Sequence, residues 1–173
     1  MSIKIKEKTQ IEKIDESNIN YKIAYNSKNN KFNYLGNWLE KESTIFVNET
    51  NNKKNNKPNF KKGEIIKVDF GINMGSELSN IHFAIVLNSD DNNSVDNITV
   101  LPLTSKPGYK RLYLGNLLKA FKKDTKYNKN SYALITQITT ISKNKIFKDN
   151  IRFYCDKETL EKINKEIINF LTK

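Results

Sequence analysis

The residues best suited to chemistry lie between positions 76 and 106. They are, in chain order, Ser76, Glu77, His82, Thr104, Ser105 and Lys106. His82 is the only histidine, and an imidazole exchanges protons near neutral pH because its unperturbed pKa is about 6.5. The Thr104 hydroxyl and the Lys106 ammonium are donors that suit a phosphate. This combination favours acid–base chemistry at a phosphodiester.

The residue types argue against a metal or cofactor. One histidine and one cysteine, Cys155, cannot supply a zinc cluster. The pair Gly71 and Gly75 lacks the Gly-Lys-Ser/Thr that completes a nucleotide-binding phosphate loop. A proton acceptor, a proton donor and donors for phosphoryl oxygens can act on a phosphate ester without a metal. We therefore expect a site without metal or cofactor.

Short strands joined by polar loops must position these residues. Apolar, β-branched runs separated by Gly- and Asn-rich joints predict strands, and an apolar stripe at three- and four-residue spacing after Asp156 predicts a capped helix. The expected strands are Ile65–Phe70, His82–Asn88, Ile98–Leu103, Arg111–Leu114 and Tyr132–Ile141, with a short one beginning at Lys145–Phe147, and the expected helix is Lys157–Leu171. Several short strands with one closing helix predict a small, strongly bent antiparallel sheet or barrel of the α+β class.

The first third of the chain has a different pattern. Apolar residues at helical spacing predict two helices within residues 1–56, with a break at Ser27–Asn30. The stretch Thr50–Asn59 is polar and rich in Lys and Asn, which is typical of a linker. We therefore expect a helical extension, 1–56, and a barrel domain, 57–173. The helices could pack on the barrel and do nothing more, or offer a surface to a dimer mate or another partner.

Charge favours a polyanionic partner. The formal net charge is +11, from 30 basic and 19 acidic side chains. Residues 107–152 carry eleven basic and two acidic side chains, a net of +9, directly after Thr104. Although a charge run is usually a solvated face, this one adjoins the candidate chemistry, which favours phosphate contact. The single cysteine indicates a cytoplasmic protein, and no stretch is apolar enough for a membrane span.

Four pieces in order carry a family resemblance. They are Gly63–Phe70 (GEIIKVDF), Gly75–Glu77 (GSE), Ala84–Leu87 (AIVL) and Val100–Thr104 (VLPLT), followed by Tyr132–Ile138 (YALITQI). Over roughly residues 60–172 the sequence resembles the MazF/PemK endoribonuclease toxins. The resemblance implies an SH3-like barrel and a metal-independent, sequence-specific cleavage of single-stranded RNA. In such a cleavage the ribose 2′-hydroxyl attacks the adjacent phosphorus, which leaves a 2′,3′-cyclic phosphate and a 5′-hydroxyl.

The same resemblance implies roles for particular residues. The family's arginine after the G-S-E loop falls on His82, its next proline falls on Phe83, and its threonine falls on Thr104. We expect His82 to replace the arginine as the proton-transfer group, although a lone histidine at a strand end could equally be a satisfied structural residue. RNA contacts are expected from a larger set that comprises Ser76, Glu77, Ser105, Lys106, Lys110, Arg111 and Gln137. Each of these could instead be ordinary surface or a capped turn.

The resemblance also implies partners. We expect a homodimer and a cognate antitoxin, an acidic protein in preference to an RNA. Two other functions are compatible with the same barrel. One is a non-catalytic toxin that binds a protein target such as gyrase, and the other is an RNA-binding barrel without activity.

Overall fold

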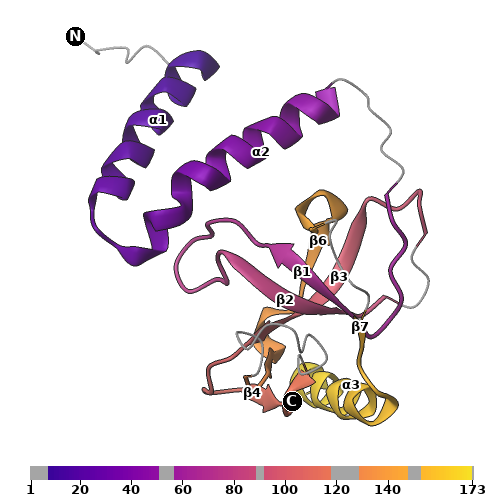
Figure 1. Ribbon diagram of the computed structural model, residues 1–173. Coiled ribbons are helices and arrows are strands. Elements are labelled where there is room, and N and C mark those ends of the chain that lie inside the picture. The colour runs from indigo at the N-terminus through magenta and orange to yellow at the C-terminus, as the bar shows by residue number, and fades with distance from the viewer. Residues whose placement is uncertain (1–7, 51–56, 89–91, 118–128, 148–152, 173) are drawn as a thin grey trace.

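A strongly bent antiparallel sheet forms the centre of the molecule (Figure 1). The computed structural model describes residues 8–50, 57–88, 92–117, 129–147 and 153–172. The strands are β1 (Glu64–Asp69), β2 (Ile81–Val86), β3 (Asn97–Thr104), β4 (Arg111–Tyr113), β5 (Tyr132–Leu134), β6 (Thr139–Ser142) and β7 (Phe153–Tyr154). Their order is β4-β5-β3-β2-β1-β7, and β6 also pairs with β3. This arrangement confirms the predicted fold.

The bend arises at β3, the longest strand. Its first half pairs with β6 at Asn97–Val100, and its end pairs with β5 through Leu103 and Thr104. The prediction of one continuous strand over Tyr132–Ile141 is therefore wrong. The backbone leaves the extended conformation at Leu134 (ψ 77°), and the 3₁₀ helix η4 (Ile135–Gln137) separates the two pieces. This turn lets both pieces pair with β3 while the sheet folds over.

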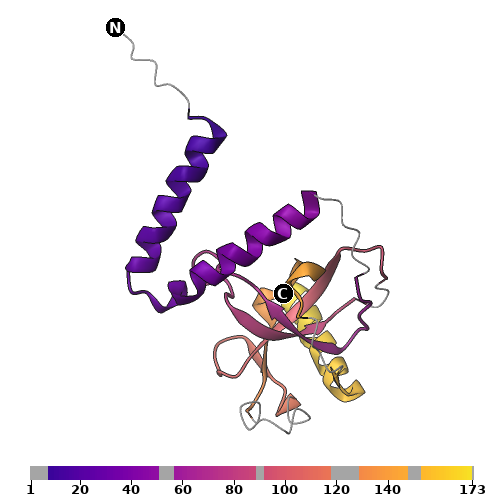
Figure 2. The same cartoon turned by 45° about the horizontal axis from the view of Figure 1, so that its top comes forward.

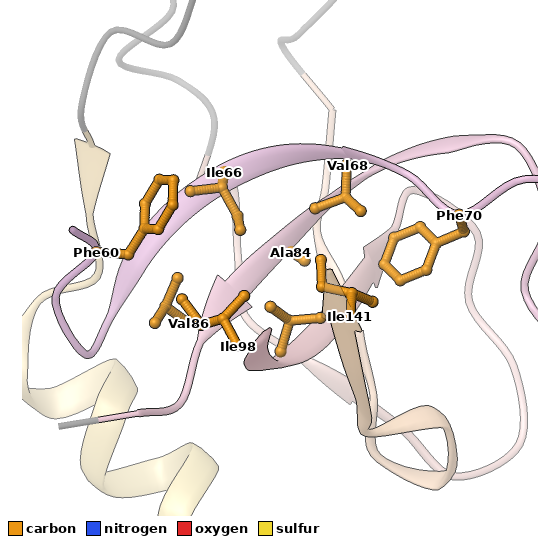
Figure 3. Close-up of a cluster of buried hydrophobic side chains, with 9 residues drawn as sticks. Phe60, Ile66, Val68, Phe70, Ala84, Val86, Ile98 and Ile141 are labelled. Atoms are coloured by element: carbon orange, nitrogen blue, oxygen red, sulfur yellow. The ribbon is translucent and has the colours of Figure 1, made fainter. Parts of the chain in front are cut away.

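Both faces of the sheet are buried, which explains why the central strands are almost continuously apolar. One face holds the cluster shown in Figure 3, which includes Ile66, Val68 and Ala84. The opposite face holds Ile65, Ile85 and neighbouring residues. Because successive side chains of a strand point to opposite faces, each run supplies both clusters. Full burial of one such side chain contributes about 1.5–3 kcal/mol.

Helix α3 (Lys157–Thr172) covers the second cluster. Asp156 caps it, as predicted: its Oδ1 accepts a hydrogen bond from the Thr159 amide at 2.7 Å. Ile163 is fully buried, and Leu160 and Ile167 pack partly against the same cluster. The apolar stripe thus packs on the sheet as its spacing predicts.

The N-terminal third forms α1 (Gln10–Asn26), the 3₁₀ helix η1 (Asn30–Tyr34) and α2 (Leu35–Thr50). The predicted break at Ser27–Asn30 is present. Helix α1 buries none of its residues and stands apart from the barrel in both views (Figures 1 and 2). Helix α2 buries Leu35 and Trp38. The extension therefore meets the barrel through η1 and α2.

Three further expectations concern residues 51–56, 118–128 and 145–147. Positions 51–56 of the expected linker, and the basic residues at 118–128, lie outside the described residues. The strand expected to begin at Lys145–Phe147 is replaced by the 3₁₀ helix η5 (Lys143–Lys145) and one isolated bridge between Ile146 and Val68. No helix within the described ranges combines the length and apolarity that crossing a membrane requires.

Candidate active site

His82 lies near the start of β2, between β1 and β3. It is opposite Val68 in the β1–β2 register. Its Nδ1 atom is 3.1 Å from the Leu103 carbonyl oxygen, on β3. The imidazole also makes an edge-on contact with the Phe70 ring, with the centroids 6.4 Å apart. The ring is half-buried, so it is held in place without being sealed in the core.

The contact with Leu103 determines which ring nitrogen can act as a base. A carbonyl oxygen only accepts hydrogen bonds, so a neutral ring that donates to Leu103 carries its hydrogen on Nδ1 and keeps a lone pair on Nε2. Burial lowers the pKa of His82 most, and the positive charge of Lys106 lowers it further. Hydrogen bonding to the backbone of Leu103 and Ser79 raises the pKa and offsets part of that effect. With the net shift downward, the ring is neutral at pH 7.

Thr104 ends β3 beside His82. The β2–β3 pairs run from Val86 with Val100 to Ala84 with Pro102. Beyond this last pair, His82 Nδ1 contacts the carbonyl oxygen of Leu103, the residue directly before Thr104. The Thr104 hydroxyl is half-exposed and accepts a hydrogen bond from the Lys106 amide at 3.3 Å. The structure therefore brings together the two residues predicted to be catalytic.

The turn after Thr104 presents Ser105, Lys106 and Lys110 as exposed side chains. Arg111 has a more structural position than expected. Its Nη1 donates to the carbonyl oxygens of Lys106 at 3.0 Å and Pro107 at 3.2 Å, and these two hydrogen bonds stabilise the turn. Lys110 lies with its Nζ 5.5 Å from the centre of the Tyr109 ring. The turn is thus a basic rim beside His82, and RNA contact by its side chains stays a prediction.

Ser76 and Glu77 are exposed on the loop that joins β1 to β2. Gln137, on η4, holds this loop from the barrel side. Its Oε1 accepts a hydrogen bond from the Leu78 amide at 2.8 Å, and its Nε2 donates to the Ser76 carbonyl oxygen at 3.2 Å. Gln137 therefore has both ends of its side-chain amide on the loop backbone, and RNA contact by Gln137 stays a prediction.

Inside the loop, Asn73 adds three further hydrogen bonds. Its side-chain Nδ2 donates to the carbonyl oxygens of Phe70 and Leu78, and its backbone N–H donates to the Ser79 hydroxyl. These bonds give the loop a defined shape. The shape leaves the side chains of Ser76 and Glu77 in solvent.

Two residues of this region escaped the sequence analysis. Asp69, at the end of β1, is completely buried although the alternation of β1 places it with Lys67 on the more polar face. Trp38, on α2, packs over Gly71 at the base of the loop. In the sequence, the one feature that drew attention to Asp69 was its position directly before an aromatic residue and a glycine, Phe70 and Gly71. The sequence indicated Trp38 only as one member of an apolar stripe at helical spacing.

The groups at this site are a neutral imidazole, a hydroxyl and exposed ammonium groups, set beside a defined loop. In the described ranges, no three His, Cys, Asp or Glu side chains lie close enough together to hold a metal ion. Such a site offers one proton acceptor and several donors for an anion.

Comparison with solved structures defines the class of fold. MazF (Form-I) from Deinococcus radiodurans aligns with a TM-score of 0.50 and 15% identity, over 67% of this chain and 99% of that chain. An endoribonuclease in complex with its cognate antitoxin, from a Mycobacterial species, aligns with a TM-score of 0.46 and 16% identity, over 68% of this chain and 96% of that one. The alignment with the Deinococcus radiodurans structure shows that the barrel has the MazF fold. No curated protein matches the sequence.

The family follows from a sequence profile. The profile described as "PemK-like, MazF-like toxin of type II toxin-antitoxin system" matches residues 61–171, well over half of the chain. The chain belongs to this family of toxins. The match leaves residues 1–60 outside, so the helical extension is additional to the shared domain.

Proposed function

We propose that this toxin is a metal-independent, sequence-specific endoribonuclease that cleaves single-stranded RNA with His82 as its base. The observation that carries the proposal is the contact of His82 Nδ1 with the Leu103 carbonyl oxygen, next to Thr104. This contact favours the tautomer of His82 that leaves Nε2 free to act as a base. It also holds the ring at the end of β3, the strand that presents the Thr104 hydroxyl. Family membership supports a toxin, and the site supports this chemistry.

In the proposed reaction, Nε2 of His82 takes the proton of the ribose 2′-hydroxyl. The 2′-oxygen forms a bond to the adjacent phosphorus, and the bond from phosphorus to the 5′-oxygen breaks. The departing 5′-oxygen takes a proton from solvent water. Thr104 and Lys106 donate to the phosphoryl oxygens, which carry more negative charge in the transition state. The products are a 2′,3′-cyclic phosphate and a 5′-hydroxyl.

The surroundings of the site fit a negatively charged strand. Lys106 and Lys110 lie on the exposed turn beside His82, and Ser76 and Glu77 lie on the loop that adjoins it. Positive groups attract the phosphate backbone, while the loop side chains can contact bases. A cognate antitoxin would compete for this basic surface if it carries an acidic segment. A second copy of the chain would cover a free edge of the bent sheet at β4 or β7.

Mapping the ends of cleaved RNA tests the proposal. The full-length protein is incubated with a long RNA in the presence of a metal chelator, and the new ends are sequenced and treated enzymatically to reveal their phosphates. We expect cuts at a short recurring sequence, with 2′,3′-cyclic phosphate and 5′-hydroxyl ends. Intact RNA would contradict the proposal, and salt-sensitive binding without cleavage would instead favour a non-catalytic barrel.

A further inference from the structure

The N-terminal extension touches the loop between β1 and β2 at its base. Trp38 on α2 is almost fully buried and packs against Gly71. A Cβ atom built on Gly71 would be 2.5 Å from the Trp38 ring, closer than such atoms approach. Gly71 also has a φ of +80°, which favours glycine. The backbone here is shaped to receive the indole.

A buried carboxylate ties the extension and the loop together. Asp69 accepts hydrogen bonds at Oδ2 from Lys41 Nζ at 2.8 Å and from the Tyr34 hydroxyl at 3.2 Å. Its Oδ1 accepts from the Gly71 amide at 3.1 Å. Burying a carboxylate is unfavourable unless it is paired and hydrogen-bonded. Two of these donors come from the extension and one from the loop, so each side stabilises the other through Asp69.

A third contact lies further along the loop. Lys31 Nζ, on η1, donates to the Gly75 carbonyl oxygen at 2.8 Å. Gly75 directly precedes Ser76, whose carbonyl oxygen accepts from Gln137 on the barrel. The loop is therefore held from the extension at Gly71 and Gly75, and from the barrel at Ser76 and Leu78.

We propose that the N-terminal extension positions the β1–β2 loop for RNA, through Trp38, Lys31 and the donors on Asp69. For its RNA part this inference rests on the proposed function. A loop already ordered before binding loses less conformational entropy when RNA arrives, which strengthens binding. His82 and Thr104 stand on β2 and β3, whereas the hydrogen bonds from the extension go to Gly75 and Asp69. The extension thus acts on substrate binding, while the proton transfer stays with the strands.

Hydrogen exchange of the full-length protein tests the positioning without any RNA. Two variants, Trp38→Ala and Lys31→Ala, remove contacts to the loop. Their controls are Phe46→Ala, an exposed position on the same helix, and Lys13→Ala, an exposed position on α1. We expect faster exchange of amides 71–80 in the first pair only, with β3 unchanged in all four. Loop exchange at the wild-type rate in both Trp38→Ala and Lys31→Ala would overturn the inference.

Cleavage kinetics then test the consequence for RNA. With a short RNA containing the mapped cleavage sequence, we expect Trp38→Ala to raise KM about tenfold, while kcat stays within about twofold. A fall in kcat at unchanged KM would overturn the inference, because the extension would then act on the chemistry. If the wild type cleaves no RNA, the proposed function fails, and the exchange experiment still decides whether the extension orders the loop.

Discussion

His82 Nδ1 and the Leu103 carbonyl oxygen lie 3.1 Å apart, and this contact joins the start of β2 to the end of β3. It favours a hydrogen on Nδ1 of His82, the only histidine in the chain. It also holds the imidazole within one residue of Thr104. A single hydrogen bond thereby links the proposed base to the end of the strand that carries the proposed phosphate donor.

Thr104→Ala should lower kcat/KM about a hundredfold, the usual effect of removing one donor to a transition-state oxyanion. Thr104→Ser keeps the hydroxyl and should retain most of the activity. The matched control is Thr140→Ala, on β6, where the lost contact is a hydroxyl pair with Thr99 at 3.1 Å. Cleavage assays on a defined RNA measure all three. Equal losses for Thr104→Ala and Thr140→Ala would mean that the effect is structural.

The pH dependence of cleavage should report the His82 pKa. Burial and then Lys106 lower that pKa below its ordinary value of about 6.5, and the base must be neutral to act. We therefore expect full activity at pH 7, with a decline that has its midpoint below pH 6.5. The folded protein should lose stability in the same range, because the unfolded chain binds the proton more readily. An acidic limb centred above pH 7 would contradict this environment for His82.

Gly71→Ala and Gly75→Ala form a matched pair. Both glycines have positive φ, +80° and +53°, so each substitution strains the backbone by about 1 kcal/mol. Only Gly71→Ala also displaces Trp38, because nothing lies within 4 Å of a Cβ at Gly75. Trp38 is the only tryptophan, so its fluorescence reports the contact. We expect the emission to shift to longer wavelength in Gly71→Ala alone, and a shift of equal size in Gly75→Ala would contradict the packing described.

Cys155 should be unreactive in the folded protein. It is buried, and burial with the nearby Asp156 charge raises the pKa of its thiol to about 12. The thiolate that reacts with disulfide reagents is therefore scarce at neutral pH. We expect slow labelling of the native protein by a chromogenic disulfide and rapid labelling in urea. Rapid labelling without denaturant would show that the strand β7 and helix α3 do not shield the thiol.

The sequence predicts well what depends on local pattern. The runs of β1, β2 and β3, and the stripe and Asp156 cap of α3, are visible because side-chain period and capping act over a few residues. The family motifs single out His82 and Thr104, and their catalytic roles stay a prediction. The division of Tyr132–Ile141 is not, because it depends on both halves meeting the same strand, β3.

The contacts around the loop depend on residues far apart in the chain. Asp69 meets Lys41 and Tyr34 from 28 and 35 positions away, and Gln137 reaches Leu78 from 59 positions away. Nothing in the spacing of such residues indicates that they meet. A carboxylate on a strand predicts exposure, and only the docked extension explains why Asp69 is buried.

The most direct test of the account is the single-turnover cleavage rate of purified His82→Ala, measured beside the wild type on one defined RNA with metal chelated. Removal of a general base slows a reaction by about 10²–10⁴-fold. The account predicts a loss in this range, with an unfolding midpoint close to that of the wild type. Cleavage by His82→Ala at the wild-type rate would contradict it.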